Sequence, residues 1–319
     1  MGRKDYLPLT LQQRDIWIDQ KINPGNSSYN IGVFVRISGP FDRNLAAQTI
    51  QHLIRNNDAL RLAFAEKNGQ PYQYFHKIFN IRFPYYDFSN KDSPEEDCLA
   101  WIRSDFNEPF HRMDQPPVDF TLLKAADTLF FLYTKQHHLI IDGYGFSLQA
   151  RQFIHIYNKL LRGATLESDD SFSFRTQIVN NQNYAHSKQY LIDEAFWKER
   201  FPDVPEPILF HSNAQSIDHN HMKSRRKSIQ VSIQEYKLFK QMLKKKRVPR
   251  FAFMLGILFC FLYRLTGKKD ISLGVPLLKR TYRKAFKTIG LYTGVMPFRM
   301  TINPNIPLLE FVSKLNSEL

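Results

Sequence analysis

Three observations predict that this chain is an α+β protein with two lobes. Segments with apolar residues at helical spacing alternate with short segments rich in Val, Ile and Phe, so helices and strands are mixed along the sequence. A length of 319 residues is enough for two hydrophobic cores. A polar stretch at residues 167–173 separates two longer segments that could each form one of these cores. We therefore expect an N-terminal lobe over residues 1–170 and a second lobe over residues 171–319.

In the first lobe, capping and turn residues mark where elements begin and end. Thr10, with Gln13 three residues later, predicts a capping box at a helix start, and Ser93 predicts another helix N-cap. Asn68 and Gly69 predict the turn of a hairpin. With the apolar periodicity, these signals predict helices from Thr10 and at Asp42–Asn57, Ser93–Phe106 and Phe146–Leu161, and strands at Tyr29–Ile37, Leu60–Lys67, Tyr72–His76, Ile81–Tyr86, Val118–Lys124 and Thr128–His138.

The second lobe is predicted to begin with a mostly helical stretch, Phe174–Phe201. The most apolar segment of the chain, Arg250–Leu265, predicts a buried helix. The other periodic segments predict helices at Ile233–Lys245 and Leu308–Leu319, and strands at Ser228–Val231, Asp270–Pro276 and Gly294–Ile302.

The composition indicates a folded protein of a reducing compartment. Hydrophobic residues make up 43% of the chain, which excludes a disordered protein. Cys98 and Cys260 both lie in apolar segments, so we expect core residues and no disulfide framework. The N-terminus lacks a secretion signal, and the longest apolar run, from Phe251 to Tyr263, has about 13 residues where a membrane span needs roughly 20. We expect a cytoplasmic protein that does not enter a membrane.

The chain is strongly basic. It contains 44 Lys and Arg against 30 Asp and Glu, which gives a net charge of +14. The electrostatic field of a chain with this net charge favours an acidic partner. The basic runs at residues 223–227, 244–247 and 279–284 are not part of a nucleic-acid-binding motif, so nucleic acid is not the partner that we expect.

The stretch with the most chemical information is residues 135–146, which contains His137, His138, Asp142 and Gly143. It follows a strand-like run and precedes a helical one, so these residues are expected at a strand-to-helix corner. Because adjacent strand residues point to opposite faces, only one of the two histidines faces a given cleft. A histidine supplies a general base, and the Gly143 N–H at the helix start suits a developing oxyanion. Acyl transfer needs these groups.

Alternatives stay open at this corner. Asp142 either orients an imidazole or holds the corner through a basic partner, and the histidine pair is also compatible with ordinary packed or solvated side chains. No Ser or Cys is placed as a covalent nucleophile, which favours direct transfer between two bound substrates over an acyl-enzyme. The other histidine cluster, His211, His219 and His221, lacks the spacing of a zinc site, so we expect no metal.

The stretch from His137 to Gly143 resembles the HHxxxDG motif of condensation domains from nonribosomal peptide synthetases, within the chloramphenicol acetyltransferase-like superfamily. The motif also occurs in wax-ester synthases and related acyltransferases. Four further segments are similar to patterns of condensation domains, in family order: Leu7–Trp17, Asn57–Phe64, Gly274–Arg280 and Ile289–Arg299. The resemblance implies two chloramphenicol acetyltransferase-like lobes in a V, with the second lobe incomplete here because domains of this family are considerably longer.

The resemblance also implies a role for each site residue. His138 would be the catalytic histidine, which positions or deprotonates the amine that attacks a thioester, and Gly143 would stand close to that thioester. His137 would be structural, as would Asp142 in a salt bridge to Arg280 across the two lobes. The reaction would be amide-bond formation between acyl and aminoacyl thioesters on phosphopantetheine, with no cofactor of the domain's own. The partners would be acidic carrier domains and an adenylation domain in the same or an adjacent chain.

The sequence also departs from the family pattern. Gly294 stands where the family usually has Asn, and Gly145 where it often has Ser. The Tyr-Gly-Phe after Asp142 and Gly143 is similar to the opening condensation domain of a siderophore-type synthetase, which accepts an aryl or acyl starter. Two rival functions remain, a free-standing acyltransferase that uses an acyl-CoA-type thioester and a catalytically silent fragment that docks carrier domains.

Overall fold

The computed structural model of the chain describes residues 5–166, 173–208 and 227–319. The chain divides into two compact units: unit 1 comprises Met1–Leu191 and Leu278–Gly294, and unit 2 comprises Ile192–Leu277 and Val295–Leu319. Residues 278–294 thus pack with unit 1 although most of unit 2 precedes them in sequence. Residues 167–172 of the expected linker, the cluster of His211, His219 and His221, and most of the basic run at 223–227 lie outside the described residues.

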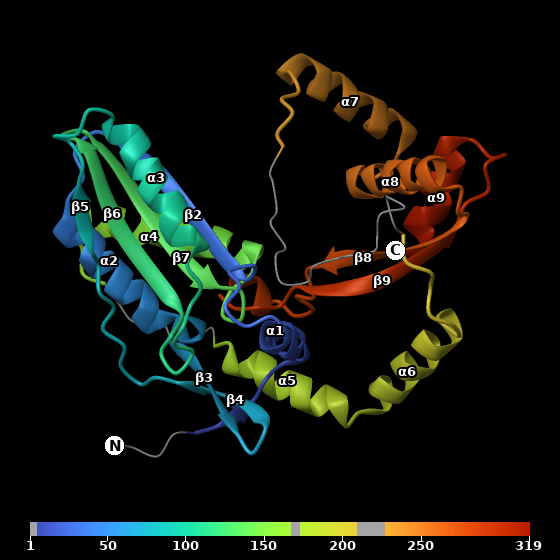
Figure 1. The fold of residues 1–319 in the computed structure, drawn as a ribbon, viewed down its shortest axis with the longest axis horizontal. Helices are drawn as coiled ribbons and strands as arrows, with labels where there is room; N and C mark the ends of the chain where they lie inside the picture. The colour runs from blue at the N-terminus through green and yellow to red at the C-terminus, as the bar shows by residue number, and fades with distance from the viewer. Residues whose placement is uncertain (1–4, 167–172, 209–226) are drawn as a thin grey trace. The chain divides into compact units, whose positions relative to one another are not determined.

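Unit 1 is built around a four-stranded sheet with the strand order β2-β7-β6-β5 (Figure 1). Strands β2 (Asn30–Ser38) and β6 (Val118–Ala126) both run antiparallel to β7 (Leu129–His137). The short edge strand β5 (Tyr85–Asp87) runs parallel to β6. Apolar residues occupy both faces of β6 and β7, because helices cover the sheet on both sides (Figure 1).

Alternate residues of the central strands divide between two helical layers. Helix α3 (Pro94–Asn107) packs on one face, in a cluster that includes Phe131. Helices α2 (Arg43–Asn56) and α4 (Gly143–Leu161) pack on the other face, in the main core of the unit. The His-His-x-x-x-Asp-Gly motif lies between the end of β7 and the start of α4, one of the two helices on this second face.

A smaller sheet and several short elements complete unit 1. The capping box of Thr10 and Gln13 is confirmed, and so is the hairpin turn, in which Asn68 and Gly69 both have positive φ angles. The smaller sheet has the order β1-β4-β3. Its strands and the remaining elements are β1 (Leu7–Pro8), α1 (Leu11–Ile22), η1 (Asp58–Arg61), β3 (Leu62–Lys67), β4 (Gln70–Phe75), α5 (Arg175–Ala185) and η3 (Ala285–Lys287).

Unit 2 has its own core. Strands β8 (Asp270–Leu277) and β9 (Gly294–Thr301) pair with each other, and α8 (Arg250–Thr266) packs against α9 (Leu308–Glu318). The other helices are α6 (Lys188–Arg200), which begins in unit 1, and α7 (Ile233–Lys246). Among the described residues, no single helix is long and apolar enough to cross a bilayer, although α7 and α8 together, with a bend of 98°, meet the criteria of length and composition.

Four sequence predictions were wrong in detail. Helix α8 is buried on one face only, because residues such as Phe251 and Phe261 are exposed by half or more. Ser228–Val231 forms no strand and is exposed throughout, since no strand among the described residues pairs with it. The strand predicted at Ile81–Tyr86 is limited to β5, where β6 provides a partner. Ser93 does occupy the N-cap position of α3, but its side chain makes no capping hydrogen bond.

Candidate active site

The corner between β7 and α4 is held by backbone pairing on one side and by buried side chains on the other. The His138 N–H donates to the carbonyl of Tyr29 at 2.8 Å, which extends the pairing of β2 and β7 by one residue. The three residues that follow, Leu139, Ile140 and Ile141, are fully buried in the main core of unit 1. Helix α4 begins at Gly143 and not at Phe146, three residues earlier than its apolar pattern predicted.

His137 is held inside the corner by contacts on all sides of its ring. It is buried, and its imidazole lies near the rings of Tyr29 and Phe110. Nδ1 accepts the Leu139 N–H at 3.2 Å, so the ring proton is on Nε2, which lies 3.4 Å from Oε1 of Gln20. Burial, with a smaller contribution from His138, lowers the pKa of His137 to about 3. His137 therefore carries no charge at neutral pH.

His138 has the opposite character. Strand alternation puts its side chain on the face that α4 covers, together with Gln136. It is half-buried, and no described residue makes a hydrogen bond to its imidazole. A histidine whose ring nitrogens are not engaged within the described part of the chain is available to accept a proton or a hydrogen bond from a substrate.

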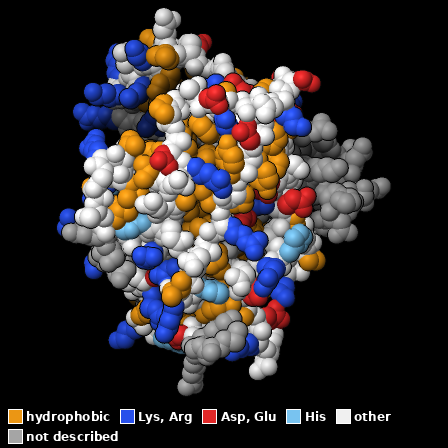
Figure 2. Space-filling model, turned by 90° about the vertical axis from the view of Figure 1, so that its left-hand side faces the viewer, with side chains coloured by type: hydrophobic (Ala, Val, Ile, Leu, Met, Phe, Trp, Pro, Cys, Tyr) orange, Lys and Arg blue, Asp and Glu red, His pale blue; other side chains and the backbone are white. Residues whose placement is uncertain are grey.

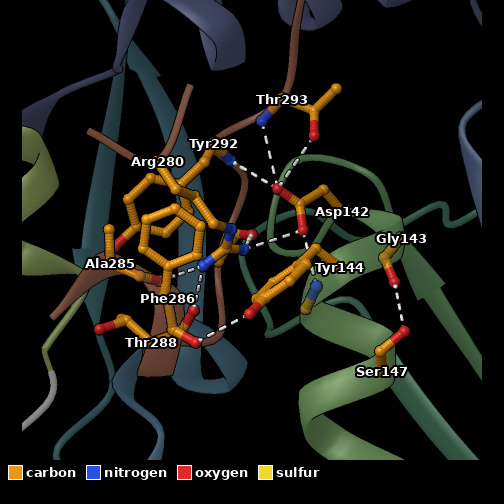
Figure 3. A network of polar contacts seen from close by, with 12 residues as sticks. Asp142, Gly143, Tyr144, Ser147, Arg280, Ala285, Phe286, Thr288, Tyr292 and Thr293 are labelled. Atoms are coloured by element: carbon orange, nitrogen blue, oxygen red, sulfur yellow. Dashed lines mark hydrogen bonds and ion pairs between the residues drawn. The ribbon is translucent and has the colours of Figure 1, made fainter. Parts of the chain in front are cut away.

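Asp142 is fully committed to holding the corner together (Figure 3). Its Oδ1 accepts hydrogen bonds from the N–H of Gly145 at 2.7 Å and from Nη2 of Arg280 at 2.9 Å. Its Oδ2 accepts from the N–H of Tyr292 at 3.0 Å and from both the N–H and the hydroxyl of Thr293 at 3.2 Å. Among the described residues, none of its hydrogen bonds comes from His138. Of the two alternatives from sequence, the geometry favours a brace with a basic partner.

Arg280 fixes this brace to the segment that follows it. Its guanidinium is fully buried and also donates to the carbonyls of Ala285, Thr288 and Gly290. The rings of Tyr144 and Tyr292 lie 4.6 and 4.1 Å from the guanidinium carbon, so the charge is enclosed by cation–π contacts (Figure 3). Both Asp142 and Arg280 belong to unit 1, so the salt bridge is internal to that unit.

Two N–H groups at the start of α4 remain without an acceptor among the described residues. Of the first four N–H groups of the helix, that of Gly145 donates to Oδ1 of Asp142 and that of Phe146 to the carbonyl of Asp142. Those of Gly143 and Tyr144 are left, as expected where a helix begins. Gly143 is exposed, and an added Cβ there would meet no atom within 4 Å. The positive end of α4 is thus open to a ligand that develops negative charge.

The neighbouring glycines are packed far more tightly. A Cβ on Gly145 would lie 2.8 Å from Cγ1 of Ile141, which is buried. A Cβ on Gly290 would lie only 2.2 Å from the ring of Phe174, a fully buried residue of α5's N-terminus. A Cβ on Gly294, by contrast, would meet only the flexible side chains of Gln12 and Lys279, at 3.3 Å or more.

The structure therefore brings His137, His138, Asp142, Gly143 and Arg280 into one region of unit 1. The sequence patterns did not indicate Tyr144, Tyr292 or Thr293, which hold the Asp142–Arg280 pair. Tyr292 and Thr293 do lie in the fourth segment that resembled the family, but a local pattern contains no signal for a backbone N–H that donates to a carboxylate. Cys98 is buried, as expected, while Cys260 is only half-buried.

The fold and this corner together define the class of protein. The mixed helices and sheets of this chain are those of the chloramphenicol acetyltransferase-like fold that solved condensation domains share. Residues 3–319 match the family model of the condensation domain, so the chain belongs to the condensation-domain family.

Similar proteins are synthetases of much greater length. The chain is 26% identical over 311 residues to the dimodular nonribosomal peptide synthase of Bacillus subtilis (strain 168), covering 98% of this chain and 13% of that protein. It is 25% identical over 322 residues to enterobactin synthase component F of Escherichia coli (strain K12), covering 98% of this chain and 24% of that protein. The chain thus spans only a small part of the curated relatives.

Solved condensation domains share the fold. A variant of the starter condensation domain of rhizomide synthetase RzmA in complex with C8-CoA has a TM-score of 0.82 and 25% identity, with coverage of 98% of this chain and 70% of that chain. The first condensation domain of the calcium-dependent antibiotic (CDA) synthetase has a TM-score of 0.84 and 19% identity, with coverage of 98% and 74%.

Proposed function

We propose that the chain catalyses amide-bond formation between an acyl or aminoacyl thioester and an amine, each carried on the phosphopantetheine arm of a carrier domain. The observation that carries this proposal is the contrast at the corner. His138 has an unengaged imidazole and Gly143 an open N–H, whereas both carboxylate oxygens of Asp142 are saturated by hydrogen bonds from the scaffold. Family membership supports the same reaction.

The proposed reaction uses the corner residues in distinct roles. The amine nitrogen attacks the thioester carbonyl, forming the C–N bond, while His138 positions the amine or accepts its proton. The N–H groups of Gly143 and Tyr144 stabilise the oxyanion of the tetrahedral intermediate. The C–S bond then breaks, and the proton passes to the leaving thiolate, which departs as phosphopantetheine thiol. His137, Asp142 and Arg280 hold the corner and do not touch the reacting atoms.

The donor that we propose is an aryl or acyl starter, as in the opening domain of a siderophore-type synthetase. One solved structure supports a starter role: a variant of the starter condensation domain of rhizomide synthetase RzmA, in complex with C8-CoA. The Tyr-Gly-Phe that follows Asp142 and Gly143 is similar to the sequence of such an opening domain and supports the same donor.

The proposed partners are acidic carrier domains and an adenylation domain of the same or an adjacent chain, in the cytoplasm. The net charge of +14 suits an acidic partner. Lys and Arg side chains are spread between hydrophobic ones over the face seen in Figure 2, with fewer Asp and Glu. Charges on an exposed surface raise the rate at which two proteins associate more than they tighten the complex. Because salt screens these charges, carrier binding should weaken as the salt concentration rises.

The test is His138→Ala in the natural protein that carries the chain, with product measured by mass spectrometry. A donor carrier loaded with the starter and an acceptor carrier loaded with an amino acid are supplied together. We expect the amide product to be lost, while loading of both carriers and the unfolding temperature stay unchanged. His111→Ala, at an exposed histidine, is the matched control and should retain full activity.

Other outcomes would identify the rival functions. Product formation by His138→Ala at the original rate would refute the assignment. Turnover of an acyl-CoA with a free amine, but not with carriers, would indicate a free-standing acyltransferase. Carrier binding by the original chain without turnover of any donor would indicate a silent docking domain.

A further inference from the structure

Gly294 stands where the family usually has Asn, and the proposed reaction assigns it no role. It belongs to unit 1 and directly follows Thr293, whose N–H and hydroxyl donate to Oδ2 of Asp142. A Cβ at residue 294 would lie 3.3 Å from Cγ of Gln12 and 3.4 Å from both Cδ and Cε of Lys279. The space that an asparagine side chain would enter is therefore bordered by Gln12 and Lys279.

Gln12 has a buried polar atom that the fold leaves without a partner. The residue is only 8% exposed, and its Oε1 accepts no hydrogen bond from the described residues. A buried acceptor without a donor costs free energy, so a donor from a ligand would be favourable here. The next residue, Gln13, donates from Nε2 to the carbonyl of Leu139, so the unpaired acceptor lies close to the corner that contains His138.

Lys279 brings a positive charge to the same space. It is half-buried, and no described residue accepts a hydrogen bond from its ammonium group. Its φ angle of 45° is in the left-handed region, which is uncommon for a residue with a side chain, so the fold holds it there against its local preference. Burial lowers the pKa of Lys279, and the negative charge of Asp15 opposes this effect only in part.

Asp15 supplies the opposite charge. It follows Gln12 by three residues in α1 and so lies on the same side of that helix. Partial burial raises the pKa of Asp15, although the positive charges of Lys279 and Arg14 oppose the rise. Within the described part of the chain, the carboxylate and the ammonium of Lys279 form no direct ion pair. Neither charge is fully compensated by the protein, so a polar group that bonds to both would be stabilised.

A carboxamide has the hydrogen-bonding groups that this space requires. Its carbonyl oxygen accepts a hydrogen bond from the ammonium of Lys279, and its NH2 group donates to Oε1 of Gln12 and to the carboxylate of Asp15. A carboxylate satisfies only the lysine, because it has no N–H to donate, and an alkyl group satisfies none of the three. Because Gly294 has no side chain, the space is open to a group from the substrate.

We infer that Gln12, Asp15 and Lys279 select an acceptor amino acid whose side chain ends in a carboxamide. The inference rests on the proposed function, because it names the acceptor of that same site. The acceptor is the substrate concerned, since the proposed donor is an aryl or acyl starter, which has no such side chain. These three residues contact the side chain of the acceptor and not its reacting atoms, so His138 and Gly143 keep their roles.

The first test compares three acceptors of one shape. Stable analogues of asparaginyl, aspartyl and leucyl N-acetylcysteamine thioesters, with an amide in place of the thioester, are titrated into the 319-residue chain by calorimetry. We expect the asparaginyl analogue to bind at least about tenfold more tightly than the other two, because each of them leaves polar groups unpaired. Equal or tighter binding of the leucyl analogue would overturn the inference. Tighter binding of the aspartyl analogue would also overturn it, because Lys279 alone would then select an anion.

The second test removes the charge or fills the space. Lys279→Met keeps an unbranched side chain beside residue 294 without the ammonium, and Gly294→Asn restores a carboxamide from the protein itself. In each variant we expect the preference for the asparaginyl over the leucyl analogue to fall to about threefold or less, with leucyl binding unchanged. Lys284→Met is the matched control, because Lys284 is an exposed lysine of the same segment and its loss changes the net charge equally.

Two results with the variants would refute the site. One is a preference for the asparaginyl analogue that both variants retain. The other is an equal weakening of all three ligands by Lys279→Met, which would place the lysine against a group that all acceptors share. Should Gly294→Asn not fold, Lys279→Met alone decides between these outcomes.

The binding measurements need no turnover, so this inference and the proposed function fail separately. A preference for the asparaginyl analogue that the variants remove, without any amide product from loaded carriers, would leave the site in place and refute condensation. Amide formation at equal rates from asparaginyl and leucyl carriers, with equal binding of the two analogues, would do the reverse.

Discussion

Asp142 and Arg280 are 138 positions apart in sequence, yet Nη2 of Arg280 donates to Oδ1 of Asp142 at 2.9 Å, with both side chains almost completely buried. Burial of an ion pair costs desolvation, so the pair is stable only because every other acceptor site of the carboxylate and most donors of the guanidinium are satisfied as well. The pair joins the strand-to-helix corner to residues 285–293.

Removal of one partner should therefore be costly. Asp142→Ala leaves a buried guanidinium without its counter-charge, and we expect unfolding by urea to report a loss of about 3–5 kcal/mol. The exposed pair of Arg36 and Glu95 is the control, and Glu95→Ala should cost less than about 1 kcal/mol. The double variant Asp142→Ala/Arg280→Met should lose less stability than the two single variants combined. Strict additivity would show that the two residues are not coupled.

The two glycines of the corner should respond in opposite ways to a methyl group. Gly143→Ala adds a Cβ into open space, so stability should stay within about 0.5 kcal/mol, while the rate of condensation falls because the methyl group occupies the approach to the open N–H. Gly145→Ala pushes against buried Ile141 and should lower the free energy of unfolding by about 1–3 kcal/mol. Thermal melts of both variants beside the product assay distinguish the two effects. Equal loss of stability in both would contradict the difference in packing, and an unchanged rate in Gly143→Ala would contradict the assignment of Gly143 to the reaction.

His137 should make the protein sensitive to acid. Its pKa is about 3 in the folded state, below that of a histidine in an unfolded chain, so the unfolded state binds the additional proton. The stabilisation is complete above about pH 6.5 and is lost as the pH falls toward 3, by at most about 1.4 kcal/mol per pH unit.

Urea unfolding between pH 4 and 7 measures this slope. His137→Asn, whose amide oxygen replaces Nδ1 as an acceptor for the Leu139 N–H, should flatten it, whereas the exposed His111→Asn should not. An unchanged slope in His137→Asn would show that another group titrates.

Gly290 and Phe174 should behave as a packing pair. A Cβ at residue 290 would lie 2.2 Å from Cδ2 of Phe174, and burial of that ring leaves it little space to move. We expect Gly290→Ala to destabilise unit 1 by about 1–3 kcal/mol, measured as a shift of the unfolding midpoint. Phe174→Leu should recover part of this loss when combined with Gly290→Ala. A second substitution that only adds to the damage would show that the strain has another source.

By itself, the sequence determined what depends on neighbouring residues. The capping box of Thr10 and Gln13 and the turn at Asn68 and Gly69 are local, because each is decided by hydrogen bonds or φ angles within a few positions. The alternation of strand side chains likewise placed His137 and His138 on opposite faces. The α+β class and the condensation-domain resemblance followed from such local patterns in their order along the chain.

Tertiary structure alone decided what depends on residues far apart. Only the folded chain shows that Asp142 is saturated by Arg280, Tyr292 and Thr293 and so does not bond to His138. The same holds for the packing of residues 278–294 with unit 1, for the exposed face of α8, and for the space beside Gly294. The physical reason is common to all four. Burial and hydrogen-bond saturation are set by which distant surfaces meet, and no spacing within a single segment specifies that.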